Sequence, residues 1–367
     1  MQTGLQKRIA QAVSAGCVAI ACTSWCMPAH SHSTPVGAIP PEVQFAKGKG
    51  LNAGELTNLT PAELAARVRQ FRELGVKWIR LGFEWQMIQP AKADDYDWWQ
   101  QDRVVDALAA ADIRILGLLA YTPAWANGGQ TSKYFPPKDP AAFARFAHQA
   151  AVRYSSNRVP AWEIWNEPNL GNFWQPAANA EHYAQLLKLS ATAIRKASPQ
   201  ALILSGGLAQ PYASKKDQDA RQFLQALYRA GAGSYFDAVA NHPYTTPHLA
   251  SGFQGHNWRK MTLGIPSMRQ IMADHGDGGK RIWITEFGAP TAGKADFDIK
   301  VDEATQAELL TDVYALAATA KWIGPVFWYD FQDFCPASAD KTTECYYGLL
   351  RYDGAPKAAF DAYRATP

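Results

Sequence analysis

Short runs rich in β-branched and aromatic residues alternate with longer amphipathic runs along this 367-residue chain, at intervals of about 35 to 45 residues. Such alternation is typical of βαβ units around a parallel sheet, which can be an open doubly wound sheet or a closed barrel. An eighth strand, the first in order, is expected between Val36 and Asn52. The other predicted strands cover residues 76–83, 113–121, 161–167, 201–208, 236–242, 281–287 and 323–330.

Helix signals fill the intervals between these strands. Thr60-Pro61-Ala62-Glu63 is a capping box with proline at the first helical position, and Asp139-Pro140 opens another helix in the same way. Eight strands and eight helices in strict alternation, with no linker, repeat or shift in composition, fit a single-domain (β/α)8 TIM barrel better than a doubly wound sheet. Further helical patterns cover 97–111, 179–198, 217–230, 264–275, 303–320 and 355–364.

The first 32 residues differ from the rest of the chain. Lys7 and Arg8 precede an apolar run over residues 9–25, and small residues follow around positions 29–33. This pattern predicts a secretory signal peptide over residues 1–32, cut near positions 29–35. Residues 33–367 are then expected to form the barrel, exported to the periplasm or the extracellular space.

A membrane anchor fits the same segment less well, because its apolar run is short for a bilayer span and contains polar residues such as Gln11. We therefore expect no membrane span in the mature form. A lipoprotein anchor through Cys17 or Cys22 stays open, although neither cysteine follows a convincing lipobox.

Cysteine usage agrees with export. Three of the five cysteines lie in the first 32 residues, which leaves Cys335 and Cys345. A pair that closes an 11-residue loop in an oxidising compartment is expected to form a disulfide, worth about 2 to 3 kcal/mol. Two cysteines without clustered histidines make a poor metal site, so neither a metal nor a cofactor is expected.

The charge balance gives no sign of a polyanionic partner. The formal net charge is +3, and it falls to +1 when Lys7 and Arg8 are lost with the leader, which has no acidic residue. Neither nucleic acid nor an anionic membrane is therefore expected as a partner. We also expect the protein to be a monomer.

Barrel enzymes carry their chemistry at the carboxyl ends of the strands and in the loops that follow. Two carboxylates, Glu167 and Glu286, end the fourth and seventh predicted strands and would face each other across the barrel mouth. Hydrolysis of a glycosidic bond needs such a pair, one acid to protonate the leaving oxygen and one base or nucleophile. Alternatively, each glutamate only pairs with a barrel cation such as Arg80. The other polar or aromatic strand ends are Glu84, Asn166, Asn241, His242, Tyr244 and Trp328.

The motifs around both glutamates resemble those of clan A glycoside hydrolases, retaining barrel enzymes with glutamates on strands four and seven. The resemblance is greatest to family 39 and to related exported bacterial endoglycosidases that act on exopolysaccharide. It spans most of the chain after the leader. Its motifs are WEIWNEPN (162–169), WITEFG (283–288), IRLGFEW (79–85), TPAWA (122–126), SGGL (205–208), FDAVANHPY (236–244) and FWYD (327–330).

The resemblance implies a role for each polar residue at the site. Glu167 is the general acid/base, Glu286 is the nucleophile, and Asn166 hydrogen-bonds the 2-hydroxyl of the sugar. His242 and Tyr244 line the site and orient Glu286. Arg80 is expected to lower the pKa of the Glu286 carboxyl, whereas burial and the Glu286 charge keep Glu167 protonated. Alternatively, Arg80 only neutralises Glu163 or Glu84, and His242 is a core histidine.

Strand parity is expected to separate the two glutamates of WEIWNEPN. Residues 163, 165 and 167 share one face of a strand, so both carboxylates would point into the barrel. Glu167 lies at the rim, and Glu163 lies about 13 Å deeper, where Arg80 or Lys77 would pair with it.

Aromatic rings at a barrel mouth can stack on sugar rings. Trp328 matches the strand-eight platform of clan A, and Trp125 and Trp174 lie in the loops after strands three and four. These three are predicted to bind substrate, while the tryptophans within strands are explained by packing. Tyr134, Phe135 and Phe173 could extend the cleft or only hold their loops in place.

These features predict an exported retaining β-glycoside hydrolase that cleaves a poly- or oligosaccharide, with carboxyl groups about 5 to 5.5 Å apart. Endo action is expected, because the accessory β-domain of family 39 xylosidases has no counterpart after the last predicted helix and no large insertion blocks the groove. The loops 122–138 and 244–263 could still close a pocket. An exo-β-glycosidase, a transglycosidase with the same residues, or a non-catalytic carbohydrate-binding barrel remain as alternatives.

Overall fold

The strands form one closed parallel barrel. The computed structural model describes residues 48–366 except for 92–94, 212–213, 253–256, 296–298 and 340, so the predicted signal peptide lies outside the described residues. Every pair of neighbouring strands is parallel, and β1 pairs with both β2 and β9, which closes the sheet. The strands are β1 (Lys49–Asn52), β2 (Trp78–Glu84), β3 (Arg114–Ala120), β4 (Ala161–Ile164), β5 (Leu202–Leu204), β6 (Leu208–Ala209), β7 (Ala238–His242), β8 (Arg281–Phe287) and β9 (Ile323–Trp328).

The fifth predicted strand is divided in two. Both β5 and β6 pair with β7, and the residues between them, 205–207, leave the strand geometry. Together they occupy one position in the sheet, so the barrel has the eight strand positions that the sequence predicted. The (β/α)8 fold is thereby confirmed.

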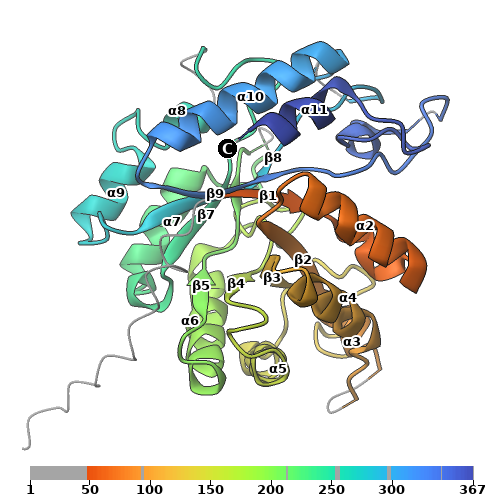
Figure 1. The fold of residues 1–367 in the computed structure, drawn as a ribbon. Helices are drawn as coiled ribbons and strands as arrows, with labels where there is room; N and C mark the ends of the chain where they lie inside the picture. Colours follow the sequence, from red (N-terminus) through yellow and green to blue (C-terminus); the bar gives the residue numbers. More distant parts are fainter. Residues whose placement is uncertain are drawn as a thin grey trace, which may run out of the picture. The chain divides into compact units, whose positions relative to one another are not determined.

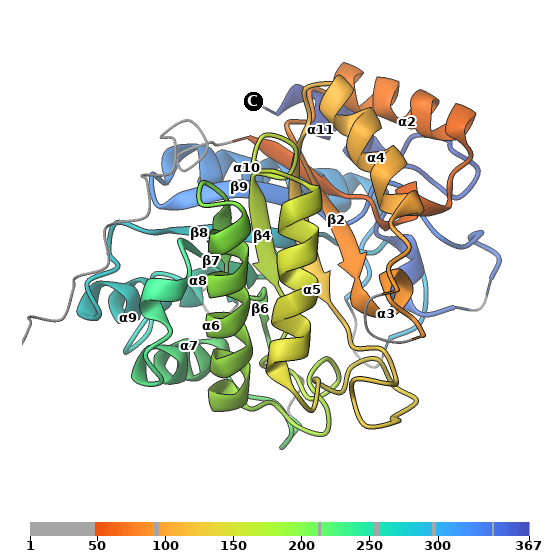
Figure 2. The same ribbon diagram turned by 90° about the horizontal axis from the view of Figure 1, so that it is seen from below.

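The helices lie outside the strands (Figure 1 and Figure 2). The predicted capping box is present, with the Glu63 N–H donating to Thr60 Oγ1 at 3.3 Å and the Thr60 N–H donating to Glu63 Oε2 at 2.8 Å. The Asp139 carboxylate likewise accepts from the Ala141 N–H at 2.9 Å. The helices are η1 (Gly54–Asn58), α2 (Pro61–Glu73), α3 (Trp85–Ile88), α4 (Trp99–Ala110), α5 (Pro140–Arg153), α6 (Ala180–Ala197), α7 (Ala220–Arg229), η2 (Gly233–Tyr235), α8 (Asn257–Lys260), α9 (Met268–Asp274), α10 (Glu303–Thr319), η3 (Thr343–Tyr346) and α11 (Ala358–Ala365).

Two apolar layers support the barrel. A larger layer lies between strands and helices, and a smaller one fills the barrel interior, where Trp78 packs edge-on against Trp283 with ring centroids 5.1 Å apart. Because side chains alternate along a strand, the residues two positions after Trp78 and Ala161, which are Arg80 and Glu163, lie above this apolar floor. The floor thus supports a polar layer nearer the carboxyl ends of the strands.

The two ends of the described chain meet. The Lys49 ammonium group on β1 donates to the carbonyl oxygens of Tyr363, Arg364 and Thr366 at 3.0, 3.2 and 2.8 Å. Lysine is favourable at a helix C-terminus because it binds the carbonyls that have no partner within the helix. This contact holds α11, dark blue in Figure 1, against the red β1.

Among the described residues, no helix has both the length and the apolar character that crossing a bilayer requires.

Candidate active site

Arg80 on β2 is the centre of the polar layer. Its Nε donates to Glu163 Oε2 and its Nη1 to Glu286 Oε1, both at 2.6 Å. Nη1 also donates to Asn52 Oδ1 at 3.1 Å, and Nη2 donates to Asn166 Oδ1 at 2.7 Å. Arg80 therefore has both of the roles that the sequence suggested. The same buried guanidinium neutralises Glu163 and contacts Glu286.

Glu163 and Glu167 differ in access as the sequence predicted, but strand parity is not the reason. β4 ends at Ile164, and both Trp165 and Glu167 have positive φ angles, of 71° and 45°. The Trp165 ring consequently leaves the barrel interior and packs 5.2 Å from Trp174. The Glu167 side chain is 10% exposed and the Glu163 side chain is 0% exposed, so a substrate can reach only Glu167.

A β-bulge brings Glu286 to the mouth of the barrel. Between Ile284 and Phe287, β8 has one residue more than the facing segment of β9, which runs from Val326 to Trp328. Bulges change the direction of side chains and are common beside active sites. Here the bulge lets two successive side chains, Thr285 and Glu286, both join the polar layer inside the barrel.

His242 and Tyr244 bind different carboxylates. The Tyr244 hydroxyl donates to Glu286 Oε2 at 3.0 Å, as predicted. His242 Nδ1 lies 2.8 Å from Glu167 Oε1 but 3.6 Å from Glu286 Oε2. The expectation that His242 orients Glu286 is therefore corrected, since its hydrogen bond goes to Glu167. Its other nitrogen, Nε2, lies 3.0 Å from Thr285 Oγ1.

The surroundings separate the acidities of the two carboxyl groups. Burial raises the pKa of Glu167 above its ordinary value, and the Glu286 charge adds to this, while His242 and Arg80 offset a part. Burial also raises the pKa of Glu286, but His242 and Arg80, with the Tyr244 hydrogen bond, outweigh burial and leave this pKa below its ordinary value. The pKa of His242 lies above its ordinary value, because the carboxylates Glu286 and Glu167 outweigh the effects of burial and of Arg80. Two carboxyl groups with opposed pKa shifts can serve as an acid and a nucleophile.

Glu167, His242 and Glu286 form a compact group, in which one oxygen or nitrogen of each lies within 4.8 Å of the others. By residue type such a group could hold a metal ion. Protein donors already engage it, however, because Arg80 and Tyr244 donate to Glu286. The arrangement is that of two neighbouring carboxyl groups, with His242 hydrogen-bonded to Glu167 and Arg80 and Tyr244 hydrogen-bonded to Glu286.

The predicted sugar platforms need correction. Trp328 is 0% exposed and Trp174 is 1% exposed, so neither presents a free ring face to a substrate in this structure. The reason for Trp328 is parity: Phe327 fills the barrel interior, and the next ring therefore points outward to Phe287. Trp125 is partly exposed, with its indole N–H bonded to the Gln89 carbonyl at 3.0 Å.

Tyr329, the residue after Trp328, has the exposure that was expected of the Trp328 ring. Its ring is partly exposed and lies 5.4 Å from the Tyr347 ring. Burial, and the charges of Asp330 and Glu286, raise its pKa well above the ordinary value. Residue 329 has the same parity as residue 327, but only the structure shows that Phe327 faces the barrel interior.

Gly207 is a second residue whose role was missed. A β-carbon at this position would lie 2.1 Å from His242 Nε2, so only glycine leaves room for the imidazole. Its N–H donates to Glu163 Oε1 at 2.9 Å. The motif SGGL marked the segment, but only the break between β5 and β6 shows why a glycine is needed there.

The predicted disulfide is present in the loop after β9. Cys335 and Cys345 are bonded, with Cα atoms 5.4 Å apart. The neighbouring Glu344 lies in η3, and its residue is exposed at the surface. Desolvation of its carboxyl group and the charges of Glu286 and Glu167 raise its pKa to about 7. The disulfide loop therefore holds a third carboxyl group within electrostatic range of the first two.

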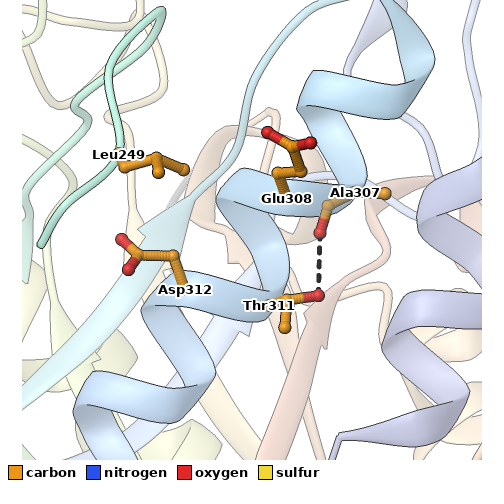
Figure 3. A pocket seen from close by; sticks show the side chains of 5 residues that line it. All are labelled: Leu249, Ala307, Glu308, Thr311 and Asp312. Carbon is orange, nitrogen blue, oxygen red and sulfur yellow. Dashed lines mark hydrogen bonds between the residues drawn. The ribbon is translucent and has the colours of Figure 1, made fainter. Parts of the chain in front are cut away.

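A shallow hollow lies elsewhere, on the outer face of α10 (Figure 3). It is lined by Leu249 and by four residues of the helix, and Thr311 Oγ1 donates along the helix to the Ala307 carbonyl at 2.9 Å. None of these residues contacts the carboxyl pair, so we do not count the hollow as part of the site.

Comparison with known proteins agrees with this geometry. Residues 45–329 match the family model described as Cellulase (glycosyl hydrolase family 5). A family 39 glycoside hydrolase from Bacteroides cellulosilyticus WH2 superposes with a TM-score of 0.68 at 24% identity, covering 89% of this chain and 64% of that one. The closed (β/α)8 barrel, together with a family model that matches most of the chain, identifies the class of protein. It is a clan A glycoside hydrolase. The chain belongs to the family Cellulase (glycosyl hydrolase family 5).

Two curated relatives carry the name β-xylosidase. The protein from Geobacillus stearothermophilus is 33% identical over 171 residues, which cover 42% of this chain and 32% of that protein. The protein from Caldicellulosiruptor saccharolyticus is 24% identical over 284 residues, which cover 73% of this chain and 56% of that protein. The chain thus spans about a third and about half of these relatives.

Proposed function

We propose that this chain is a retaining β-glycoside hydrolase that cleaves a poly- or oligosaccharide by double displacement. Glu167 is the acid/base and Glu286 the nucleophile. The observation that carries the proposal is the spacing, since carboxylate oxygens of the two residues lie within 4.8 Å of each other. Retaining enzymes hold their carboxyl groups about 5 to 5.5 Å apart, whereas inverting enzymes separate them by roughly 6.5 to 9.5 Å to admit a water.

In the first step, the ionised Glu286 attacks the anomeric carbon while the bond from that carbon to the leaving oxygen breaks. Glu167 gives its proton to the leaving oxygen, so a neutral alcohol departs and a glycosyl ester forms on Glu286. Glu286 starts ionised because Arg80 and Tyr244 donate hydrogen bonds to its carboxylate. Glu167 starts protonated because burial raises its pKa.

In the second step, Glu167 is a carboxylate and accepts a proton from water, whose oxygen attacks the anomeric carbon and releases Glu286. Two inversions give net retention. Asn166 would assist both steps through the sugar 2-hydroxyl. Its Oδ1 accepts from Arg80 at 2.7 Å, which directs its amide N–H groups away from the guanidinium, where they can donate to a substrate.

Endo action on a polysaccharide is the mode we propose, supported by the resemblance of the motifs to exported endoglycosidases. The name β-xylosidase on both curated relatives favours a second candidate, the release of single xylose units from chain ends. Transfer to a second sugar would use the same residues, with an acceptor hydroxyl in place of water.

Export is part of the same proposal. The disulfide between Cys335 and Cys345 supports it, because such bonds persist in oxidising compartments and are rare in the cytosol. The leader pattern in residues 1–32 gives independent support.

The test is to screen residues 33–367 against bacterial and plant polysaccharides, xylo-oligosaccharides and aryl β-glycosides. Oligosaccharide products indicate endo action, and monosaccharides alone indicate exo action. Proton NMR of the first product should show the β-anomer, and an α-anomer would overturn the retaining mechanism. Glu286→Gln should lose at least about 10³-fold in kcat. Glu167→Ala should regain turnover of an activated aryl glycoside when azide is added, with a β-glycosyl azide as product.

A further inference from the structure

Thr285 and Glu163 form a hydrogen-bonded chain behind the acid/base residue. We infer that they are positioning residues that fix which nitrogen of His242 faces Thr285 with a proton and thereby hold a further proton between His242 Nδ1 and Glu167. The inference rests on the proposed role of Glu167. It assigns a function to Glu163 beyond its ion pair with Arg80, and to Thr285, which lies in the motif WITEFG but had no role of its own.

The chain starts at Glu163, which can only accept hydrogen bonds. Arg80 Nε donates to Oε2 at 2.6 Å and Arg80 Nη2 donates to Oε1 at 3.2 Å. The Gly207 N–H donates to Oε1 at 2.9 Å. Guanidinium and peptide N–H groups donate and never accept, so these contacts require the unprotonated carboxylate.

Thr285 connects the Glu163 carboxylate to the imidazole of His242. Its Oγ1 lies 3.1 Å from Glu163 Oε1 and 3.0 Å from His242 Nε2. A hydroxyl group has one hydrogen, and the carboxylate takes it because a carboxylate cannot donate. Thr285 Oγ1 must then accept from the imidazole, so the proton of neutral His242 is on Nε2.

The position of the proton on His242 in turn affects the protonation of Glu167. With the proton on Nε2, the lone pair of the neutral ring is on Nδ1, 2.8 Å from Glu167 Oε1. If Glu167 were ionised, two lone pairs would face each other, so the contact favours a proton between the two atoms. In the other tautomer, Nδ1–H would donate to an ionised Glu167, and the acidic proton would be lost more easily. The tautomer therefore raises the proton affinity of the pair.

Several charges face His242 besides Glu167. Glu286 Oε2 lies 3.6 Å from Nδ1, Glu163 Oε1 lies 4.0 Å from Nε2, and Arg80 acts on the ring from β2. Substitution of Thr285 leaves all of them in place. A change in the tautomer or in the acidity of the pair can then be ascribed to the hydroxyl group.

The experiment compares Thr285→Val, which removes the hydroxyl at nearly constant volume, with Thr285→Ser, which keeps it. Imidazole ¹⁵N chemical shifts identify the protonated nitrogen of neutral His242, with its signals assigned by their absence in His242→Gln. We expect Nε2–H in the wild type and in Thr285→Ser, and Nδ1–H in Thr285→Val. The alkaline limb of kcat/KM should move down by about one pH unit in Thr285→Val only, a tenfold change in proton affinity.

Activity should also fall more on aryl glycosides with poor leaving groups than on those with good ones, because only the former need the acid. An Nδ1–H tautomer in the wild-type protein would overturn the inference, and this measurement needs no variant to fold. So would a Thr285→Val protein that keeps Nε2–H and an unchanged alkaline limb. The NMR result does not depend on catalysis, so a protein with the expected tautomer and no glycosidase activity would refute only the proposed function.

Discussion

Three glutamates share one hydrogen-bonded layer, yet their partners give them different roles. Glu163 and Glu286 both accept hydrogen bonds from the buried Arg80 guanidinium. Glu167 has the imidazole of His242 instead, 2.8 Å away. Because Glu163 is fully buried and Glu167 is at the rim, loss of each side chain should affect different properties of the protein.

Glu163→Ala should destabilise the protein by about 3 kcal/mol or more, because it leaves part of a buried guanidinium without its partner. Glu167→Ala should change the unfolding free energy by less than about 1 kcal/mol, while it removes acid/base catalysis. Urea unfolding followed by tryptophan fluorescence measures both variants. Equal stability of the two proteins would contradict the assignment of Glu163 to the interior network.

Glu344 gives the protein a pH dependence near neutrality. Its pKa in the folded protein is about 7, above its value in an unfolded chain, so the folded state binds the proton more tightly. The ionised group therefore lowers stability progressively as pH rises from about 4.3 to about 7. Glu344→Gln should raise Tm relative to wild type at pH 8 and leave it unchanged at pH 4. An equal difference in Tm at both pH values would refute the shifted pKa.

At the scale of elements, departures from regular strands build the site. The bulge in β8 brings two successive side chains inward, and the break between β5 and β6 places Gly207 against His242. The positive φ angles after β4 turn Glu167 to the rim. Each departure costs conformational energy that the surrounding packing must supply.

Gly207→Ala should lower kcat/KM by about 10²-fold or more, because the new methyl group occupies the position of the His242 ring and displaces a positioned catalytic group. Gly54→Ala is the matched control, since no atom lies within 4 Å of a β-carbon there. Kinetics of both variants on the same substrate decide the matter. Equal activity of the two variants would show that the imidazole is not held in this place.

The disulfide in the loop after β9 is the second element with a measurable effect. Cys335→Ser with Cys345→Ser should lower the unfolding free energy by about 2 to 3 kcal/mol, as the length of the closed loop predicts. Calorimetry of the double variant, compared with the reduced and oxidised wild type, measures this. An unchanged KM would assign the bond to stability alone, and a raised KM would show that the loop forms a wall of the substrate groove.

For the whole molecule, closure of the barrel joins residues that are far apart in the chain. β1 pairs with β9, and Lys49 bonds three carbonyls at the end of α11, more than 300 residues away. The outer apolar layer is continuous around the barrel, so these contacts complete a core that shorter segments cannot enclose.

Lys49→Met should lower the unfolding free energy by about 2 kcal/mol, because it removes a charged donor from three buried or partly buried carbonyls. Exposed Lys77 provides the control, and Lys77→Met should have an effect of less than about 0.5 kcal/mol. Denaturant unfolding of both variants tests the difference. Hydrogen exchange in α11 should also become faster in Lys49→Met.

The sequence by itself determined the order of strands and helices, the caps at Thr60 and Asp139, the disulfide and the pair Glu167 and Glu286. Each of these features was read from a pattern or motif within a short stretch of the chain, because side-chain periodicity and capping are local. It misplaced the Trp328 and Trp174 rings and the partner of His242, and it gave no role to Thr285 or Gly207. The tertiary structure decided those, because the residue at which a strand stops being extended depends on the neighbouring strands. A change of one residue there reverses which side chains face the site.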